Sequence, residues 1–132
     1  MKKMVGWGVA ATVTMVLAVT PVAMAQTSGP VTPLAVVTSG PCSATSTWVL
    51  TLKFDAGRIE SDVEVQTNTV GQTWRFVMTD NGVKFGSGKR ITVADGSWTA
   101  TRFATNQAGT DSIVVRSKNL TTGEVCRADG TI

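Results

Sequence analysis

Histidine and tyrosine are both absent from the 132 residues of the chain. Without histidine, a serine or cysteine nucleophile lacks its commonest activating base. A serine would then need Lys or a carboxylate as its base, and neither of the nucleophile patterns Gly-x-Ser-x-Gly and Ser-x-x-Lys occurs after residue 25. These absences argue against most kinds of enzyme, and we expect a non-catalytic protein that carries no cofactor and no metal.

The first 25 residues have the three parts of a secretory signal peptide. Lys2 and Lys3 come first, an apolar stretch runs from Met4 to Val19, and Ala23-Met24-Ala25 forms a small-x-small cleavage site. We therefore expect residues 1–25 to direct export, so that the protein is secreted, extracellular or associated with the cell envelope. The alternative is an uncleaved N-terminal anchor, which would be the protein's one contact with a membrane.

Removal of the signal leaves 132 − 25 = 107 residues, the size of one small domain. All four prolines precede Cys42, and three of them lie in residues 26–41, which we interpret as a flexible tether. The domain is then expected over residues 42–132. Two of the 12 Lys and Arg residues belong to the signal, which leaves 10 against 9 acidic residues. Because no Lys/Arg run occurs, we expect no nucleic-acid partner.

Cysteine is scarce, with Cys42 and Cys126 alone in the chain. Export would place both in an oxidising compartment, where pairing is the rule. A free reactive thiol would need a neighbouring base such as histidine, which is missing. We therefore predict a structural disulfide between the two.

From residue 48 onward, apolar and polar residues alternate in short runs separated by glycine-containing turns. Turns are expected at Ala56-Gly57 and at Asn81-Gly82, and Gly86-Ser87-Gly88 is expected to interrupt a strand. We predict an all-β fold, a β-sandwich or barrel of about seven antiparallel strands. The side chains expected to point inward are Trp48, Leu50, Leu52, Phe54, Ile59, Ser61, Val63, Val65, Trp74, Phe76, Met78, Trp98 and Ala100.

The segment Ala108-Gly109-Thr110-Asp111-Ser112-Ile113-Val114-Val115, with Lys118-Asn119 and Thr122-Gly123-Glu124, resembles the last two strands of an immunoglobulin-like domain. Trp74 matches the tryptophan that such domains bury on strand C. The tyrosine corner is missing, and the cysteines lie at the ends of the domain instead of on its second and sixth strands. The resemblance implies an immunoglobulin-like β-sandwich.

The whole of residues 42–126 is similar to small exported proteins of actinobacteria. The matching segments are Thr45 to Trp48, Gly57 to Glu60, Gly71 to Trp74, Asn81-Gly82, Gly96-Ser97 and Gly109 to Asp111. This resemblance implies export and a shared fold, and it carries over no catalytic residue.

Three acidic residues, Glu60, Asp62 and Glu64, are expected on one face of a strand, with about 7 Å between each one and the next. A straight strand cannot surround a calcium ion with oxygens, and a flat, wet face would not raise a carboxyl pKa for glycoside hydrolysis. We favour a solvated surface over a metal site or a hydrolase. The three tryptophans after the signal could stack on sugars, but their apolar strand neighbours favour burial.

The function expected from the sequence is a non-catalytic, exported binding or interaction module whose partner is a protein or a cell-wall polymer. Its expected contact surfaces are the acidic row and two loops, one containing Asn68 and Gln72 and the other Asn106 and Gln107. The first alternative is a secreted inhibitor of a protease or other hydrolase. The second is a hydrolase that uses the surface carboxylates.

Overall fold

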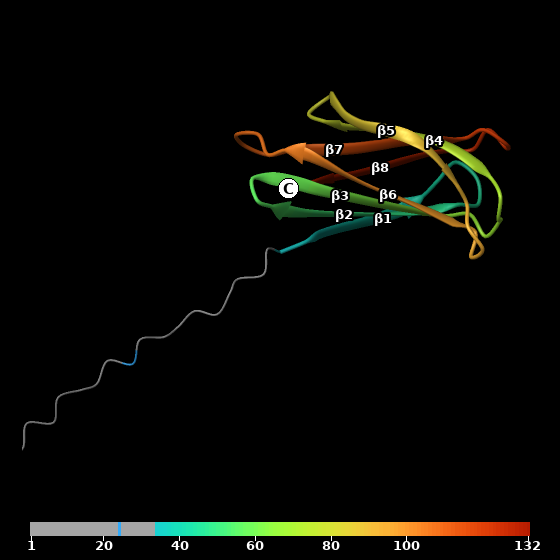
Figure 1. Ribbon diagram of the computed structural model, residues 1–132, viewed down its shortest axis with the longest axis horizontal. Coiled ribbons are helices and arrows are strands. Elements are labelled where there is room, and N and C mark those ends of the chain that lie inside the picture. Colours follow the sequence, from blue (N-terminus) through green and yellow to red (C-terminus); the bar gives the residue numbers. More distant parts are fainter. Residues whose placement is uncertain (1–23, 25–33) are drawn as a thin grey trace, which may run out of the picture. The chain divides into compact units, whose positions relative to one another are not determined.

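Eight β-strands form the regular structure in the part of the chain that the computed structural model describes, Met24 and residues 34–132 (Figure 1). They are β1 (Val36–Pro41), β2 (Thr47–Asp55), β3 (Arg58–Gln66), β4 (Thr73–Asp80), β5 (Val83–Ile91), β6 (Ser97–Thr105), β7 (Ser112–Asn119) and β8 (Val125–Thr131). The expected signal peptide, apart from Met24, and residues 26–33 of the expected tether lie outside the described residues.

The strands form two sheets of four, and every neighbouring pair is antiparallel. The first sheet has the order β1-β2-β3-β6, and the second has the order β5-β4-β7-β8. Figure 1 shows them as two layers, with β1, β2 and β3 in one and β4, β5 and β7 in the other. The predicted all-β sandwich is therefore confirmed, with eight strands instead of about seven.

The core lies between the two sheets and contains the side chains that the alternation predicts. Trp74 and Phe76 of β4 pack against Trp98 of β6, with ring centroids 6.0 Å and 5.7 Å apart, respectively. All but one of the side chains expected to point inward are buried. The exception is Phe54, which is 42% exposed close to the end of β2, where the sandwich no longer covers it.

Two hairpin turns have the backbone conformation that their residues suggest. Asn81 and Gly82 have φ angles of 47° and 83°, and Ala56 and Gly57 have 48° and 80°. Two successive positive φ angles define the turn type whose twist matches that of the flanking strands. Both predicted turns are confirmed.

The expected tether, residues 26–41, is wrong at its C-terminal end, because residues 36–41 form strand β1. Residues 36–41 pair with β2, from Val36 opposite Leu52 to Pro41 opposite Thr47. Proline is compatible with this position because β1 is an edge strand and Pro41 is its last residue. The sandwich therefore begins at Val36 and not at Cys42.

The expected interruption at Gly86-Ser87-Gly88 is wrong, since β5 continues through all three residues. The two glycines allow close approach of other side chains instead. A Cβ atom at Gly86 would lie 2.6 Å from Cγ of Arg102 on β6, and one at Gly88 would lie 3.2 Å from the Phe76 ring. The Arg102 side chain thus extends from the first sheet and packs against these two glycines of β5, where it covers one open side of the core.

The predicted disulfide between Cys42 and Cys126 is present and joins the β1–β2 loop to β8. Glu124 reinforces the same connection, because its carboxylate accepts hydrogen bonds from the Ala44 and Ser46 backbone N–H groups and from the Ser46 hydroxyl. The first and last strands are therefore tied together covalently and by charge-assisted hydrogen bonds.

Candidate functional site

The outer face of the second sheet carries most of the positive charge of the domain. On β4, β7 and β8, each of these cations lies between two buried residues and therefore points outward. The two on β5 are paired with outward-pointing residues of β4 and share their face. This cationic face consists of Arg75, Lys84, Lys89, Arg116, Lys118 and Arg127. One acidic residue, Asp129, shares it. The remaining four cations of residues 26–132 lie elsewhere in the domain, together with eight of the nine acidic residues.

Strand register places five of these cations in two adjacent rows across the sheet. Lys89, Arg75 and Lys118 are direct neighbours on β5, β4 and β7. In the next row, two residues or about 7 Å further along, Arg116 of β7 lies directly opposite Arg127 of β8. Side chains at such opposed positions have Cβ atoms only about 5 Å apart.

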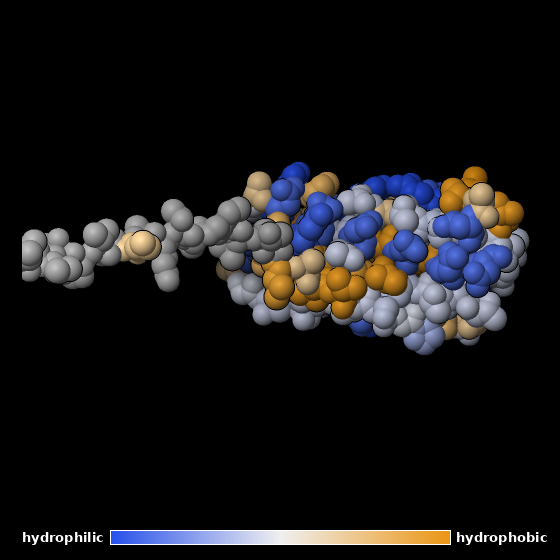
Figure 2. All heavy atoms as spheres, turned by 90° about the horizontal axis from the view of Figure 1, so that it is seen from below, coloured by the Kyte–Doolittle hydropathy of each residue, from blue (hydrophilic) through white to orange (hydrophobic). Residues whose placement is uncertain are grey.

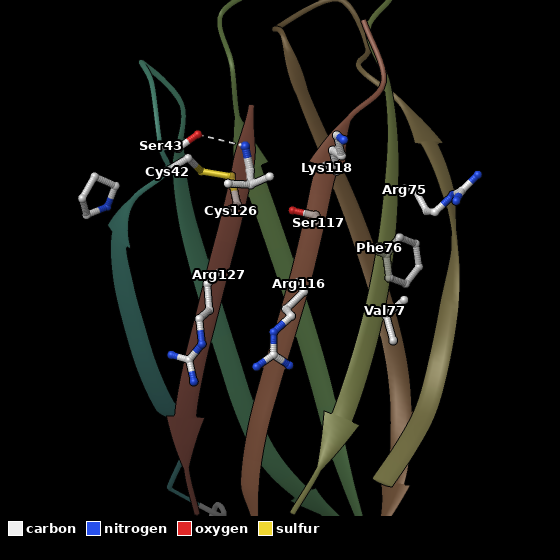
Figure 3. Close-up of a pocket in the computed structure, with 12 residues that line it drawn as sticks. Cys42, Ser43, Arg75, Phe76, Val77, Arg116, Ser117, Lys118, Cys126 and Arg127 are labelled. Atoms are coloured by element: carbon white, nitrogen blue, oxygen red, sulfur yellow. Dashed lines mark hydrogen bonds between the residues drawn. A yellow bond between two sulfur atoms is a disulfide. The ribbon is translucent and has the colours of Figure 1, made fainter. Parts of the chain in front are cut away.

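A shallow groove of about 580 Å³ runs over β4, β7 and β8 beside the disulfide (Figure 3). Arg75, Arg116, Lys118 and Arg127 line it. Figure 3 shows the Arg116 and Arg127 side chains extending in the same direction from neighbouring strands, with their guanidinium groups side by side. The Cys42–Cys126 bridge and Ser43, whose hydroxyl accepts a hydrogen bond from the Val125 N–H, fix one end of the groove.

Few of these charges are neutralised within the domain. Arg127 forms an ion pair with Asp129. Among residues 34–132, the other five cations of the face form no ion pair. Like charges directly opposite each other on neighbouring strands are destabilising. The face therefore carries uncompensated positive charge at some cost in folding stability, and an anion could bind there.

The acidic row lies on the opposite side of the sandwich, on the outer face of β3. Glu60 pairs with Lys53 at 3.1 Å, and Asp62 accepts a hydrogen bond from the Thr101 hydroxyl at 2.9 Å. Figure 2 shows the outer face of the first sheet, where hydrophilic side chains run beside an apolar strip. Within the described part of the chain, no group of three or more His, Cys, Asp or Glu residues could hold a metal ion.

The two loops expected as contact surfaces lie at opposite ends of the first sheet. The loop with Asn68 and Gln72 follows the end of β3 that pairs with Ser97, whereas Asn106 and Gln107 follow the end of β6 that pairs with Arg58. Gln72 is held by the Asn119 side chain at 3.0 Å, and the Gln107 N–H donates to Asp111. The structure does not bring these loops together into one site.

A buried carboxyl pair, Asp80 and Asp111, was not predicted from the sequence. Asp111 is fully buried and Asp80 is nearly so. Burial, followed by the charge of Asp111 and a hydrogen bond to it, raises the pKa of Asp80 above its usual range. This pair lies between the end of β4 and the start of β7, away from the cationic groove.

The three tryptophans of the domain are not available for stacking on a sugar. Trp48, Trp74 and Trp98 are all buried. The expectation that they belong to the core is thus confirmed.

No protein-family model matches this chain, and neither does the sequence of any curated protein. The residues that the structure describes contain no helix of the length and apolar character needed to cross a membrane.

Proposed function

We propose that this protein is an exported, non-catalytic binding module whose cationic face binds an anionic partner. One observation carries the proposal. Six of the 10 cations of residues 26–132 gather on one sheet face that holds one of the 9 acidic residues, although the net charge is only +1. A surface of one sign steers oppositely charged partners towards itself.

The strand order supports an immunoglobulin-like assignment of the sandwich. If β3, β4, β6, β7 and β8 correspond to strands B, C, E, F and G, then B pairs with E and C-F-G are neighbours, as in immunoglobulin domains. Trp74 then occupies strand C and is fully buried. Such domains are scaffolds that commonly present a face or loops to partners, and the disulfide is compatible with export through a signal peptide at residues 1–25.

The test is retention of the oxidised protein on immobilised anionic and neutral polymers. Retention on anionic but not neutral supports is expected, and the variant Arg75→Glu/Arg116→Glu should lose it. A matched control, Lys53→Glu/Arg58→Glu, makes the same charge change on the first sheet and should remain bound. Equal loss in both variants would mean that net charge, and not this face, determines binding.

A secreted inhibitor is the second candidate, favoured by the loop that follows Cys42. Residues 43–45 are exposed, and the disulfide and Glu124 hold this loop rigidly. A rigid exposed loop could insert into a protease cleft at little cost in entropy. Inhibition of secreted proteases that disappears when Ala44 is replaced by Pro would support this function in place of anion binding.

A further inference from the structure

We infer that the ligand of the cationic face is a linear phosphodiester polymer without bases, which lies along β7 and is held by the Arg116–Arg127 pair. This inference rests on the proposed function and narrows it to one class of partner.

Two guanidinium groups side by side fit a phosphate better than a carboxylate. One guanidinium satisfies both oxygens of a planar carboxylate through a pair of parallel hydrogen bonds. A phosphodiester has two charged oxygens on a tetrahedral phosphorus, and these oxygens accept hydrogen bonds from donors that do not lie in one plane. Arg116 and Arg127 offer donors from two neighbouring strands, and the ion pair with Asp129 helps to hold the Arg127 side chain in place.

The second row of cations indicates a polymer and not a single phosphate group. Arg75, Lys118 and Lys89 lie about 7 Å from the arginine pair along the strands. A chain that places phosphates at about this interval could contact both rows at once. Since the groove is shallow and open to solvent, it does not enclose its ligand and leaves room for a chain longer than the two rows.

Among the described residues, the cationic face exposes no aromatic ring on which a base could stack, since Phe76, which borders the groove, is fully buried. Its neutral members near the groove are aliphatic or small, such as Val77, Ser87 and Val125. Proteins that bind single-stranded nucleic acids combine a cationic groove with aromatic rings on which bases stack. The absence of such rings within residues 34–132 of this face favours a phosphate polymer with a flexible aliphatic backbone.

The experiment measures the affinity of the full oxidised protein, as exported, for three probes of matched charge. They are a synthetic poly(glycerol phosphate), a polygalacturonate, and a single-stranded oligothymidylate. The poly(glycerol phosphate) should bind at least about 10-fold more tightly than the other two. Replacement of both arginines by glutamine, Arg116→Gln/Arg127→Gln, should weaken its binding about 100-fold at low ionic strength.

A second variant tests the guanidinium geometry separately from charge. Arg116→Lys/Arg127→Lys retains both charges but removes the planar donors, and it should lose most of the preference for phosphate over carboxylate. The control Arg58→Gln removes a cation from the first sheet and should leave every affinity unchanged.

Equal affinity for the phosphate and carboxylate polymers, or a preference that survives in the lysine variant, would overturn the inference and leave the proposed function standing. Tightest binding of the oligothymidylate would also overturn it, in favour of nucleic acid. No binding of any of the three polymers would contradict both the inference and the proposed function.

Discussion

Asp80 shows how one buried group makes the stability of this domain depend on pH. Its pKa in the folded protein is higher than the ordinary value of 3.8, chiefly because of burial. Between these two values the folded protein binds more protons than the unfolded chain. The stabilising contribution of this group is therefore complete below pH 3.8 and is lost as the pH rises through the folded-state pKa.

Replacement of Asp80 by Asn should remove the loss of folding stability that accompanies ionisation of Asp80 at higher pH. We expect the variant to unfold at higher urea concentration than the wild type at neutral pH, and the difference to shrink as the pH falls towards 3.8. Chemical unfolding at several pH values measures this difference, with Glu64→Gln at an exposed position of β3 as the control. A difference that is constant across the pH range would show that Asp80 does not titrate as described.

Gly86 is the residue that allows the Arg102 side chain to pack closely against β5. A Cβ atom there would lie 2.6 Å from Cγ and 3.1 Å from Cβ of Arg102, neither of which is the mobile end of that side chain. Gly86→Ala should therefore destabilise the fold by about 1 to 3 kcal/mol. The neighbouring exposed Ser87→Ala should change stability by less than about 0.5 kcal/mol. Thermal unfolding of the two variants makes the comparison, and equal stabilities would contradict this packing.

At the scale of elements, the disulfide connects the β1–β2 loop to β8 through two cysteines that are 84 residues apart in sequence. A covalent link across a loop of this length stabilises by about 4 kcal/mol, through restriction of the unfolded chain. Cys42→Ser/Cys126→Ser should therefore lower the free energy of unfolding by about this amount, measured by urea denaturation. A much smaller decrease in the free energy of unfolding would mean that the hydrogen bonds of Glu124 hold β8 to the β1–β2 loop without the bridge. In that case, adding Glu124→Gln to the double serine variant should unfold the protein.

The cationic rows should cost the second sheet stability when no ligand is bound. Arg116→Thr removes a like-charge contact with Arg127 and introduces a residue that is favourable in strands. We expect a gain of about 0.5 kcal/mol in the free energy of unfolding at low salt, and a smaller gain at high salt, where the repulsion is screened. A loss of stability would show that Arg116 is a structural residue.

Strand positions were largely predictable from the sequence, because alternation and turn residues are local signals. Trp74, Phe76 and Met78 alternate with polar or partly exposed neighbours, and Asn81-Gly82 marks the hairpin after them. Strand β1 was missed because Pro33 and Pro41 suggested a tether, whereas an edge strand tolerates proline at its end. The continuity of β5 was missed because its glycines serve packing and not a turn.

For the whole molecule, the separation of charge between the faces could not be predicted from the sequence. A net charge of +1 without a basic run gave no sign of a cationic surface. The six cations come from four strands, and pairing between β4 and β7 makes Arg75 a neighbour of Lys118, 43 residues later (118 − 75). Such adjacency depends on sheet order and register, which are set by long-range pairing. The acidic row, in contrast, lies on one strand and was predicted correctly on its outer face.

The most direct test of the account is the salt dependence of binding to a phosphate polymer, measured as the slope of log affinity against log salt concentration. Each neutralised phosphate contributes about 0.7 to this slope for a single-stranded nucleic acid, which we take as the guide for a single-chain phosphate polymer. Because the two arginines together bind one phosphate, the account predicts that Arg116→Gln/Arg127→Gln lowers the slope by about 0.7, whereas Glu60→Gln/Glu64→Gln on the opposite face leaves it unchanged. A slope that falls in the acidic-row variant, or stays the same in the arginine variant, would contradict the assignment of binding to the cationic face.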